Sequence, residues 1–274
     1  ANLLGIKAVE TLMPNVPQVA VFDTSFHQTM PDYSYMYAIP YEYYSKYKIR
    51  RYGFHGTSHK FVAQKGAALA GLDFENSKII TCHLGNGGSV TAVMNGKSVD
   101  TSMGFTPQEG VPMGTRSGSI DPTVVTYIMK KEGLNPEQME KLLNSKSGLL
   151  GISGVSSDCR DVLEAKDKGD KRSALAMEIL VHYIKKIIGS YVAEMNGLDA
   201  LVFTAGIGEN DGTVRDMICK DLSYLGIEID NDINLNCERG VLTEITKKGA
   251  RVRTFAIPTD EEYMIALDTY NLVK

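Results

Sequence analysis

The sequence predicts an α/β protein in which helices are layered against a sheet. Strand-like apolar runs alternate along the chain with segments of helical periodicity, which is typical of this fold class. Hydrophobic residues make up 43% of the 274 residues, enough for one large domain or two smaller ones. No repeat of fixed period and no low-complexity stretch interrupts the pattern, so a repeat architecture is not expected.

The chain opens on a predicted helix, whose apolar residues follow helical spacing: Leu3, Leu4, Ile6, Val9 and Leu12. No N-cap residue precedes this pattern and the first residue is not Met, so we expect a fragment of a longer protein. A buried strand is predicted over 19–22, ending on Asp23. The Tyr- and Pro-rich stretch after it predicts an irregular connector.

The middle of the chain predicts a helix, paired strands and two more helices. The first helix should begin with Thr57 or Ser58 as N-cap and stop at Gly71. Strand-like runs flank the turn "LGNGGS", and the turn "MNGK" joins a further pair. Helices are then expected at 133–146 and 171–197, the second of them long and amphipathic.

The last third of the chain predicts two strand–turn–helix units. "DALVFTAGIGENDGTVRDMICKDL" reads as a strand, a glycine-rich turn and a helix. "ARVRTFAIPTDEEYMIALDTYNLVK" reads as a strand, a proline and a helix capped by Thr259.

Composition excludes several classes of partner and location. A net charge of −4 gives no basic excess for nucleic acid or an anionic membrane surface. No apolar run approaches the ~20 residues of a membrane span, and no signal peptide is visible. The four cysteines are scattered without a C-x-x-C pair, which suits reduced thiols. We therefore expect a cytoplasmic protein.

Three glycine-rich turns follow predicted strands, at 83–89, 104–119 and 204–210. Glycine lets successive backbone N–H groups face an anion closely, and phosphate is the usual ligand of such a nest. None of the turns is a Walker A sequence. "GIGEND" approaches a dinucleotide fingerprint but lacks its last glycine. Three such turns in one α/β chain indicate phosphate binding.

Charged residues near these turns are candidates for a metal and a phosphate. A strand-end carboxylate such as Asp23 is a common Mg²⁺ anchor. Glu261 and Glu262 follow "IPTD", although taken alone they are explained better by complementing a helix dipole. Arg116, in "GTRSG", is placed to bind phosphate or carboxylate oxygens, with a solvated loop charge as the alternative. Arg160 has the same two interpretations, a contact for phosphate or carboxylate oxygens or a solvated charge.

The histidines in "RRYGFHGTSHK" raise the question of a metal pair. A zinc pair needs both rings on one helix face with a Glu between them, and here no Glu intervenes. Because the helix is predicted to start after Gly56, His55 and His59 should not share a face. A zinc hydrolase is therefore a weak alternative, and His55 is interpreted as a contact for a negatively charged group. His83 opens the first glycine turn, which suggests a phosphate contact.

Long motifs along the chain resemble those of the acetate kinases: "FDTSFHQTMP", "RRYGFHGTSHKFV", "IITCHLGNGGSVTAV", "TSMGFTPQEGVPMGTRSGSIDP", "KSGLLGISGVSSDCRD", "VFTAGIGEN" and "IPTDEE". The resemblance runs from residue 1 to 274. It implies an actin-like (ribonuclease H-like) kinase fold and reversible transfer of the ATP γ-phosphoryl group to acetate, giving acetyl phosphate and ADP. The implied metal is Mg²⁺, with Mn²⁺ as an alternative. Propionate is the alternative substrate.

The resemblance also implies a division of the chain. Residues 1–27 would be a remnant of a first domain, 28–260 a nucleotide-binding and dimerisation domain, and 261–274 a helix returning to the first domain. Members of the family begin earlier, with a phosphate loop and an essential Arg, so this fragment alone is expected to turn over little or nothing. A non-catalytic nucleotide-binding fragment is the alternative. The implied assembly is a homodimer.

Site residues are implied by the matching motifs one by one. His55 and Arg116 would stabilise the transferring phosphoryl group, and Asp23 with Glu261 would organise Mg²⁺. Phe54 and Pro107 would form the pocket for the acetate methyl group. The expected nucleotide-binding residues, with His83 from its place in the first turn, are His83, Asn86, Gly87, Asp158, Arg160, Gly206, Ile207, Gly208, Glu209 and Asn210. Asp260 stands where the family usually has Asn.

Acetate is already ionised at neutral pH, so this reaction needs no general base. Catalysis then depends on positioning and on neutralising charge on the phosphoryl oxygens.

Overall fold

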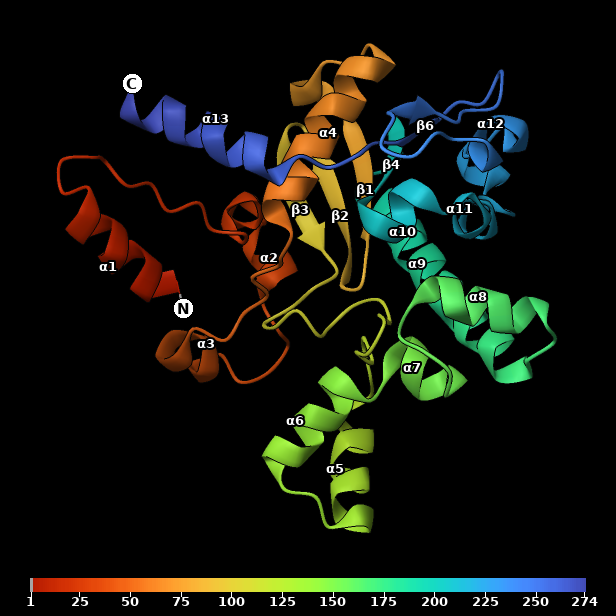
Figure 1. Cartoon of the computed structure of the whole chain (residues 1–274), viewed down its shortest axis with the longest axis horizontal. Coiled ribbons are helices and arrows are strands. Elements are labelled where there is room, and N and C mark those ends of the chain that lie inside the picture. Colours follow the sequence, from red (N-terminus) through yellow and green to blue (C-terminus); the bar gives the residue numbers. More distant parts are fainter. Residues whose placement is uncertain (1) are drawn as a thin grey trace.

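The computed structural model describes residues 2–274 and is built on one six-stranded sheet (Figure 1). Ala1, where the expected first-domain remnant begins, lies outside the described residues. The strands are β1 (Lys78–Leu84), β2 (Gly88–Met94), β3 (Lys97–Thr101), β4 (Ala200–Thr204), β5 (Thr243–Glu244) and β6 (Arg253–Ala256). Their order in the sheet is β3-β2-β1-β4-β6-β5. Strands β1 to β3 form an antiparallel meander, whereas β4 runs parallel to β1, and β6 to β4.

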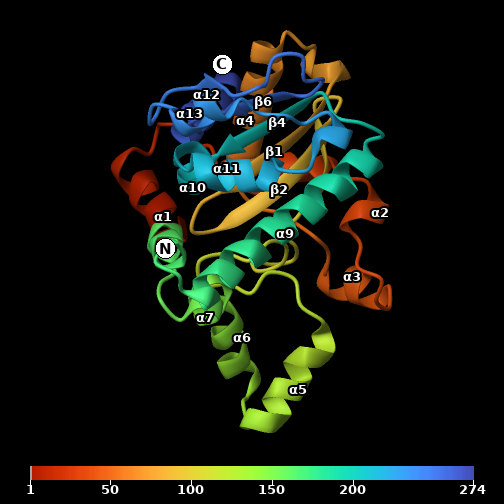
Figure 2. The same cartoon turned by 90° about the vertical axis from the view of Figure 1, so that its right-hand side faces the viewer.

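Helices cover both faces of this sheet (Figure 2). Helix α9 (Lys171–Glu194) packs over one face, where Ile80, Cys82 and Leu84 of β1 join its apolar core. Helix α4 (Gly56–Ala70) packs on the other face, beside Ile79. Because side chains alternate along a strand, Thr81 and His83 also point to the α4 side. This face becomes polar toward the end of β1, and the candidate site begins there.

The long predicted helix and the meander are confirmed, and further helices surround α9. The short α7 (Gly148–Ser153) and α8 (Cys159–Asp167) pack beside it. Helices α5 (Pro122–Glu132) and α6 (Pro136–Ser145) project from the body of the protein (Figure 1). The sequence predicted α6 but not α5. Asp121 caps α5 by accepting a hydrogen bond from the Thr123 N–H at 2.8 Å.

The expected glycine-rich turn after β4 is a short helix instead, α10 (Ala205–Asn210). It leads into α11 (Gly212–Cys219), and α12 (Asn231–Leu235) follows. The last helix, α13 (Glu261–Val273), is capped by the Asp260 side chain, which accepts from the Tyr263 N–H. The prediction of Thr259 as its cap was wrong because that hydroxyl donates to Ser58 instead.

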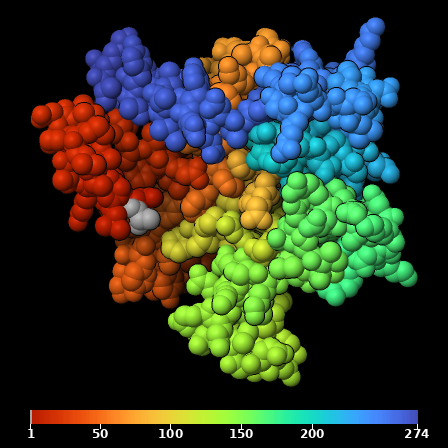
Figure 3. All heavy atoms as spheres, viewed as in Figure 1, coloured from red at the N-terminus to blue at the C-terminus, as the bar shows by residue number. Residues whose placement is uncertain are grey.

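The N-terminal helix forms as predicted, as α1 (Asn2–Leu12), but none of its residues is buried. The helix lies at the surface in Figure 3, and its apolar side chains are exposed, with Leu3 72% exposed. The strand predicted over 19–22 is absent from the described structure. A strand needs a neighbour to accept its hydrogen bonds, and no described strand pairs with this segment. The connector after it contains α2 (Asp32–Tyr35) and α3 (Glu42–Tyr47).

Three short 3₁₀ helices complete the described elements, at Ser25–Thr29, Phe74–Asn76 and Ser223–Leu225. Within residues 2–274, no helix combines the length and the apolar character needed to cross a bilayer.

Candidate functional site

The N-terminus of α4 is held by Asp23. His55 precedes the helix in a left-handed conformation, with φ of 56°, and its backbone N–H donates to Asp23 Oδ2 at 2.7 Å. The Gly56 N–H donates to the Asp23 carbonyl at 2.8 Å. A Cβ at Gly56 would lie 2.3 Å from that carbonyl oxygen, so only glycine fits. The predicted N-cap, Thr57 or Ser58, was wrong, because backbone contacts to Asp23 start the helix at Gly56 with His55 as the N-cap residue.

Four histidines meet where α4 packs on β1 and β2. The rings of His55 and His83 are stacked, with centroids 4.0 Å apart and an interplanar angle of 16°. The His55 and His59 rings are 6.4 Å apart, and both reach the same hydroxyl, that of Ser89. The expectation that these two histidines face apart was therefore wrong. It failed because the left-handed turn at His55 directs its side chain back along the helix face.

The metal-pair alternative does not fit this geometry. His55 Nδ1 lies 2.8 Å and His59 Nε2 2.7 Å from Ser89 Oγ, so both nitrogens have hydrogen-bond partners. Among the described residues, no three His, Cys, Asp or Glu side chains are grouped so that they could hold a metal ion. A zinc site usually needs three or four such ligands, so the zinc hydrolase alternative lacks a site.

Burial keeps these histidines neutral. It lowers the pKa of His27 to about 4 and that of His83 to about 3. The pKa of His59, which is fully buried, falls well below 6.5. The pKa of His55 is also lowered by burial and by the Arg116 charge, against an opposing effect of Asp23. Neutral imidazoles can donate a hydrogen bond to a phosphoryl oxygen without the cost of a buried charge.

Arg116 and the first glycine turn lie beside His55. The Arg116 guanidinium is partly buried, and its Nη1 donates to the Pro107 carbonyl at 3.0 Å. A Cβ built on Gly87 would lie 3.4 Å from that nitrogen and 3.6 Å from His55 Nε2. The structure therefore brings Arg116, His55 and Gly87 together, as the sequence predicted, and Arg116 is more than a solvated loop charge.

The expected acetate-pocket residues lie next to this group. The Phe54 carbonyl accepts a hydrogen bond from His27 Nε2 at 2.9 Å. His27, which had no role from sequence, thus anchors the residue before His55. Pro107 anchors Arg116 through its carbonyl. The backbone of both predicted residues therefore supports the two candidate phosphoryl contacts.

Two carboxylates approach each other beside the α4 N-terminus. Glu261 is the first residue of α13, and its pKa is raised by burial and by the negative charge of Asp23. A cation between the two groups would offset that repulsion. Mg²⁺ is commonly held by one or two carboxylates plus phosphate oxygens, so this pair fits the metal expected from the sequence.

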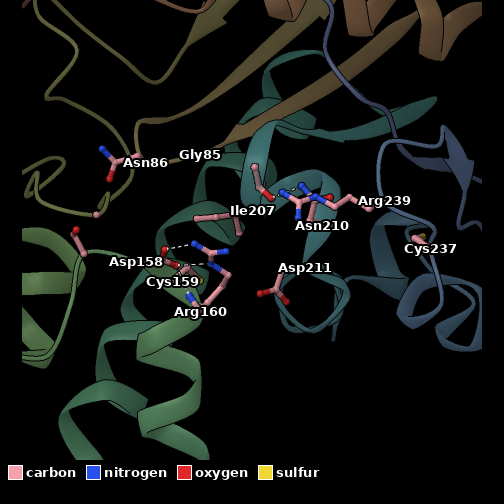
Figure 4. A pocket seen from close by; sticks show the side chains of 13 residues that line it. Gly85, Asn86, Asp158, Cys159, Arg160, Ile207, Asn210, Asp211, Cys237 and Arg239 are labelled. Carbon is pink, nitrogen blue, oxygen red and sulfur yellow. Dashed lines mark hydrogen bonds and ion pairs between the residues drawn. The ribbon is translucent and has the colours of Figure 1, made fainter.

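An open pocket of about 580 Å³ lies beyond the glycine turn (Figure 4). Its size is that of a small-molecule site. Six of its residues were predicted from sequence: Asn86, Asp158, Arg160, Gly206, Ile207 and Asn210. The others were not: Gly85, Gly114, Ser157, Cys159, Asp211, Cys237 and Arg239. Cys237 and Arg239 come from an irregular segment after α12, where neither periodicity nor a motif indicates a site.

An ion pair forms part of the pocket wall. Arg160 Nη2 lies 2.6 Å from Asp158 Oδ2, and the Arg160 side chain is 81% exposed (Figure 4). Asp158 also caps α8 through the Arg160 N–H. These hydrogen bonds lower the pKa of the Asp158 carboxyl to about 2. The predicted pair is thus present, with its guanidinium in solvent.

Four residues predicted to bind nucleotide do not line the pocket: His83 and Gly87, which lie beside His55, and Gly208 and Glu209. Glu209 Oε1 accepts from the Ala205 N–H at 2.8 Å and from the Thr259 N–H at 3.0 Å, so this carboxylate ties α10 to the segment before α13. Gly208 is buried against β4. Arg215, a buried residue that sequence reasoning missed, donates to the carbonyls of both residues and holds the end of α10 in place.

The chain is similar to known proteins over its whole length. The model of the acetokinase family matches residues 1–267. An acetate kinase of Caldanaerobacter subterraneus subsp. tengcongensis is 57% identical over 275 residues, which cover 100% of this chain and 68% of that protein. The crystal structure of Porphyromonas gingivalis acetate kinase matches with a TM-score of 0.97 at 49% identity, covering 100% of this chain and 68% of the other. A propionate kinase structure from Francisella tularensis subsp. tularensis SCHU S4 matches with a TM-score of 0.90 at 48% identity, covering 97% and 67%.

The fold and these relatives identify a kinase, a phosphotransferase that uses ATP or ADP. The α/β kinase fold predicted from the sequence is confirmed by the match to solved acetate kinase structures. The chain belongs to the acetokinase family.

Proposed function

We propose that the protein transfers the γ-phosphoryl group of ATP to acetate, giving acetyl phosphate and ADP, in a reversible in-line reaction. A bond forms between an acetate oxygen and the γ-phosphorus while the bond to the bridging oxygen of ADP breaks. One observation carries the proposal. The turn that contributes Gly85 and Asn86 to the pocket continues at Gly87, which lies against Arg116 and His55. A nucleotide in the pocket would therefore extend its phosphates toward these two side chains.

The residues of this chain divide the work by position. Asp158, Arg160 and the pocket residues of α10 hold the nucleoside, and Asn86 and Gly87 contact the phosphates. Arg116 and His55 donate hydrogen bonds to the oxygens of the transferring group, where negative charge must be stabilised. His83 supports His55 by stacking against it. Phe54 and Pro107 line the pocket for the acetate methyl group. The acetate carboxylate attacks the phosphorus without a general base.

Asp23 and Glu261 would hold Mg²⁺, with Mn²⁺ as the alternative metal. When bound, the ion neutralises charge on the phosphate oxygens. Asp23 also fixes the backbone at His55. One carboxylate thus links the metal position to the phosphoryl contact.

Domain organisation, assembly and location belong to the same proposal. Residues 28–260 form the nucleotide-binding and dimerisation domain, and 1–27 with 261–274 belong to a first domain. The sparse packing of α1 supports this division. We propose a cytoplasmic homodimer without nucleic-acid or membrane partners, in line with the net charge of −4.

The test is acetyl phosphate formation by the full-length protein, trapped as the hydroxamate, with kcat/KM compared on acetate, propionate and butyrate. Acetate should be preferred. Propionate is the second candidate because a propionate kinase structure matches closely. One methylene changes binding in a pocket by only about 1–3 kcal/mol, so a 10- to 200-fold preference is expected. A butyrate preference, or no acetyl phosphate at all, would overturn the proposal.

A non-catalytic nucleotide-binding role is the alternative for residues 1–274 by themselves. Helix α1 packs none of its residues into a core, so part of this chain lacks the support seen around the sheet. The same assay on the 274-residue chain, beside nucleotide binding by calorimetry, separates the two roles. Binding without turnover favours the alternative, and robust turnover rules it out.

A further inference from the structure

A row of buried side chains runs behind His55, away from the pocket. Thr81 Oγ1 lies 2.6 Å from His59 Nδ1, and His59 Nε2 lies 2.7 Å from Ser89 Oγ. Ser89 Oγ lies 2.8 Å from His55 Nδ1. Thr81, His59 and Ser89 are each 0% exposed, so the row is closed to bulk solvent. The order of the row is thus Thr81, His59, Ser89, His55.

The hydrogen bonds along this row can be donated in either of two directions, from Thr81 toward His55 or from His55 toward Thr81. Ser89 has one hydroxyl hydrogen and two histidine neighbours, so it donates to one ring and accepts from the other. If Ser89 donates to His55 Nδ1, the His55 hydrogen stays on Nε2. If it donates to His59 instead, His55 carries its hydrogen on Nδ1, and Nε2 presents a lone pair.

The far end of the row decides between the two directions. Within the described chain, the Thr81 hydroxyl has His59 as its one hydrogen-bond partner. If Thr81 accepted from His59, its own hydrogen would be buried without an acceptor, at a cost of about 1–3 kcal/mol. Thr81 therefore donates to His59 Nδ1. His59 has a single ring hydrogen because burial keeps it neutral, and it donates from Nε2 to Ser89.

We propose that Thr81, His59 and Ser89 form a hydrogen-bond relay that fixes the tautomer of His55 with its hydrogen on Nε2. This nitrogen faces the side of the ring where Gly87 and Arg116 lie. A hydrogen there stabilises an anionic oxygen, whereas a lone pair would repel it. His59 and Ser89 are positioning residues that act through His55. The consequence for catalysis rests on the proposed function, but the tautomer itself does not.

A second row at the neighbouring histidine has the same direction. Thr259 Oγ1 donates to Ser58 Oγ at 2.8 Å, and Ser58 Oγ lies 2.8 Å from His83 Nδ1. Ser58 accepts from Thr259, so its own hydrogen goes to His83. His83 therefore also keeps its hydrogen on Nε2. The two stacked rings of the site thus share one tautomer.

The test is a long-range ¹H–¹⁵N correlation spectrum of the full-length protein labelled at histidine, recorded at neutral pH without substrate. The expected result is a bare Nδ1 and a protonated Nε2 for His55. His27 is an internal reference, because the Phe54 carbonyl fixes its hydrogen on Nε2. A His55 with its hydrogen on Nδ1 would overturn the relay.

Thr81→Val breaks the relay at its far end without touching His55. It should populate the Nδ1–H form of His55 and lower kcat by roughly two- to fivefold, with KM for ATP nearly unchanged. Thr91→Val is the matched control. Thr91 is the partner of Thr81 on β2, equally buried, and its hydroxyl bonds Thr101 rather than a histidine. Identical His55 spectra for the two variants would contradict the proposal.

Ser89 provides the second variant. Ser89→Ala should lower kcat by about tenfold, and Ser89→Thr, which keeps the hydroxyl, should recover most of it. Failure of the proposed function can be distinguished from failure of the relay. A protein that makes no acetyl phosphate but shows the Nε2–H form of His55 refutes the function and keeps the relay. An active enzyme that shows the Nδ1–H form of His55 keeps the proposed function and refutes the relay.

Discussion

The two ends of the site differ in how their charged and polar groups are held. At the phosphoryl end, His55 and His83 lie largely out of water and are bonded to hydroxyls that are themselves buried. At the nucleoside end, the Arg160 guanidinium is 81% exposed and pairs with Asp158 beside open solvent. Electrostatic interactions are stronger in a desolvated, preorganised setting, whereas exposed ion pairs contribute only about 0–1 kcal/mol. We therefore expect the contacts that stabilise the transferring group under the proposed function to act mainly at the buried end.

The largest effect expected from this contrast is a loss of turnover at the buried end. Arg116→Ala should lower kcat by about 10²–10³, which is about 3–4 kcal/mol, because the guanidinium acts on charge that develops during transfer. Arg160→Ala at the open end should leave kcat within a few-fold and mainly raise KM for ATP. Steady-state kinetics of both variants in the full-length protein measures this. Equal losses of kcat in the two variants would contradict the expected difference between the buried end and the open end of the site.

The metal position should show an intermediate effect. Glu261→Gln should raise the Mg²⁺ concentration for half-maximal activity by roughly 10- to 100-fold, since one of two carboxylates is lost. Glu262→Gln is the matched control, because Glu262 is the next residue of α13 and lies exposed. Magnesium titration of both variants measures the difference. Matching titration curves would mean that the glutamates of α13 only complement its dipole.

The smallest effect concerns stability and pH. The pKa of His27 is about 4 in the folded protein and near 6.5 when unfolded, so the unfolded chain binds more protons between these values. The free energy of unfolding should therefore fall as pH drops from 6.5 to 4, by at most about 1.4 kcal/mol per pH unit for His27. His27→Gln should reduce this slope, and exposed His182→Gln should not. Urea unfolding at pH 7, 6 and 5 gives the slopes, and equal slopes would contradict the burial effect.

Local pattern predicted much of the fold and part of the site. The helix from 171, the meander around "LGNGGS" and the stop of α4 at Gly71 depend on periodicity and turn chemistry, which neighbours in sequence determine. The glycine turns also indicated phosphate contacts, and residues from all three line the pocket. The strand expected over 19–22 failed because a strand depends on a partner that local pattern cannot supply.

Contacts between distant segments could not be predicted in this way. Thr259 lies 201 positions from Ser58, yet its hydroxyl donates to that residue rather than capping α13. Arg215 looks like any charged helical residue, but it is buried and bonded to the end of α10. Arg239 reaches the pocket from an irregular segment. Each depends on how helices and strands pack together, which helical or strand periodicity does not encode.

By itself, the sequence determined the family, the α/β class and the residue types of the candidate phosphate contacts, because motifs and spacing are local properties of the chain. Only the tertiary structure decided that His59 is fully buried, that its ring shares Ser89 with His55, and that the row ends at Thr81. The physical reason is that the direction of a buried hydrogen bond depends on every partner around it. Those partners come from α4, β1 and β2, which meet only in the folded protein.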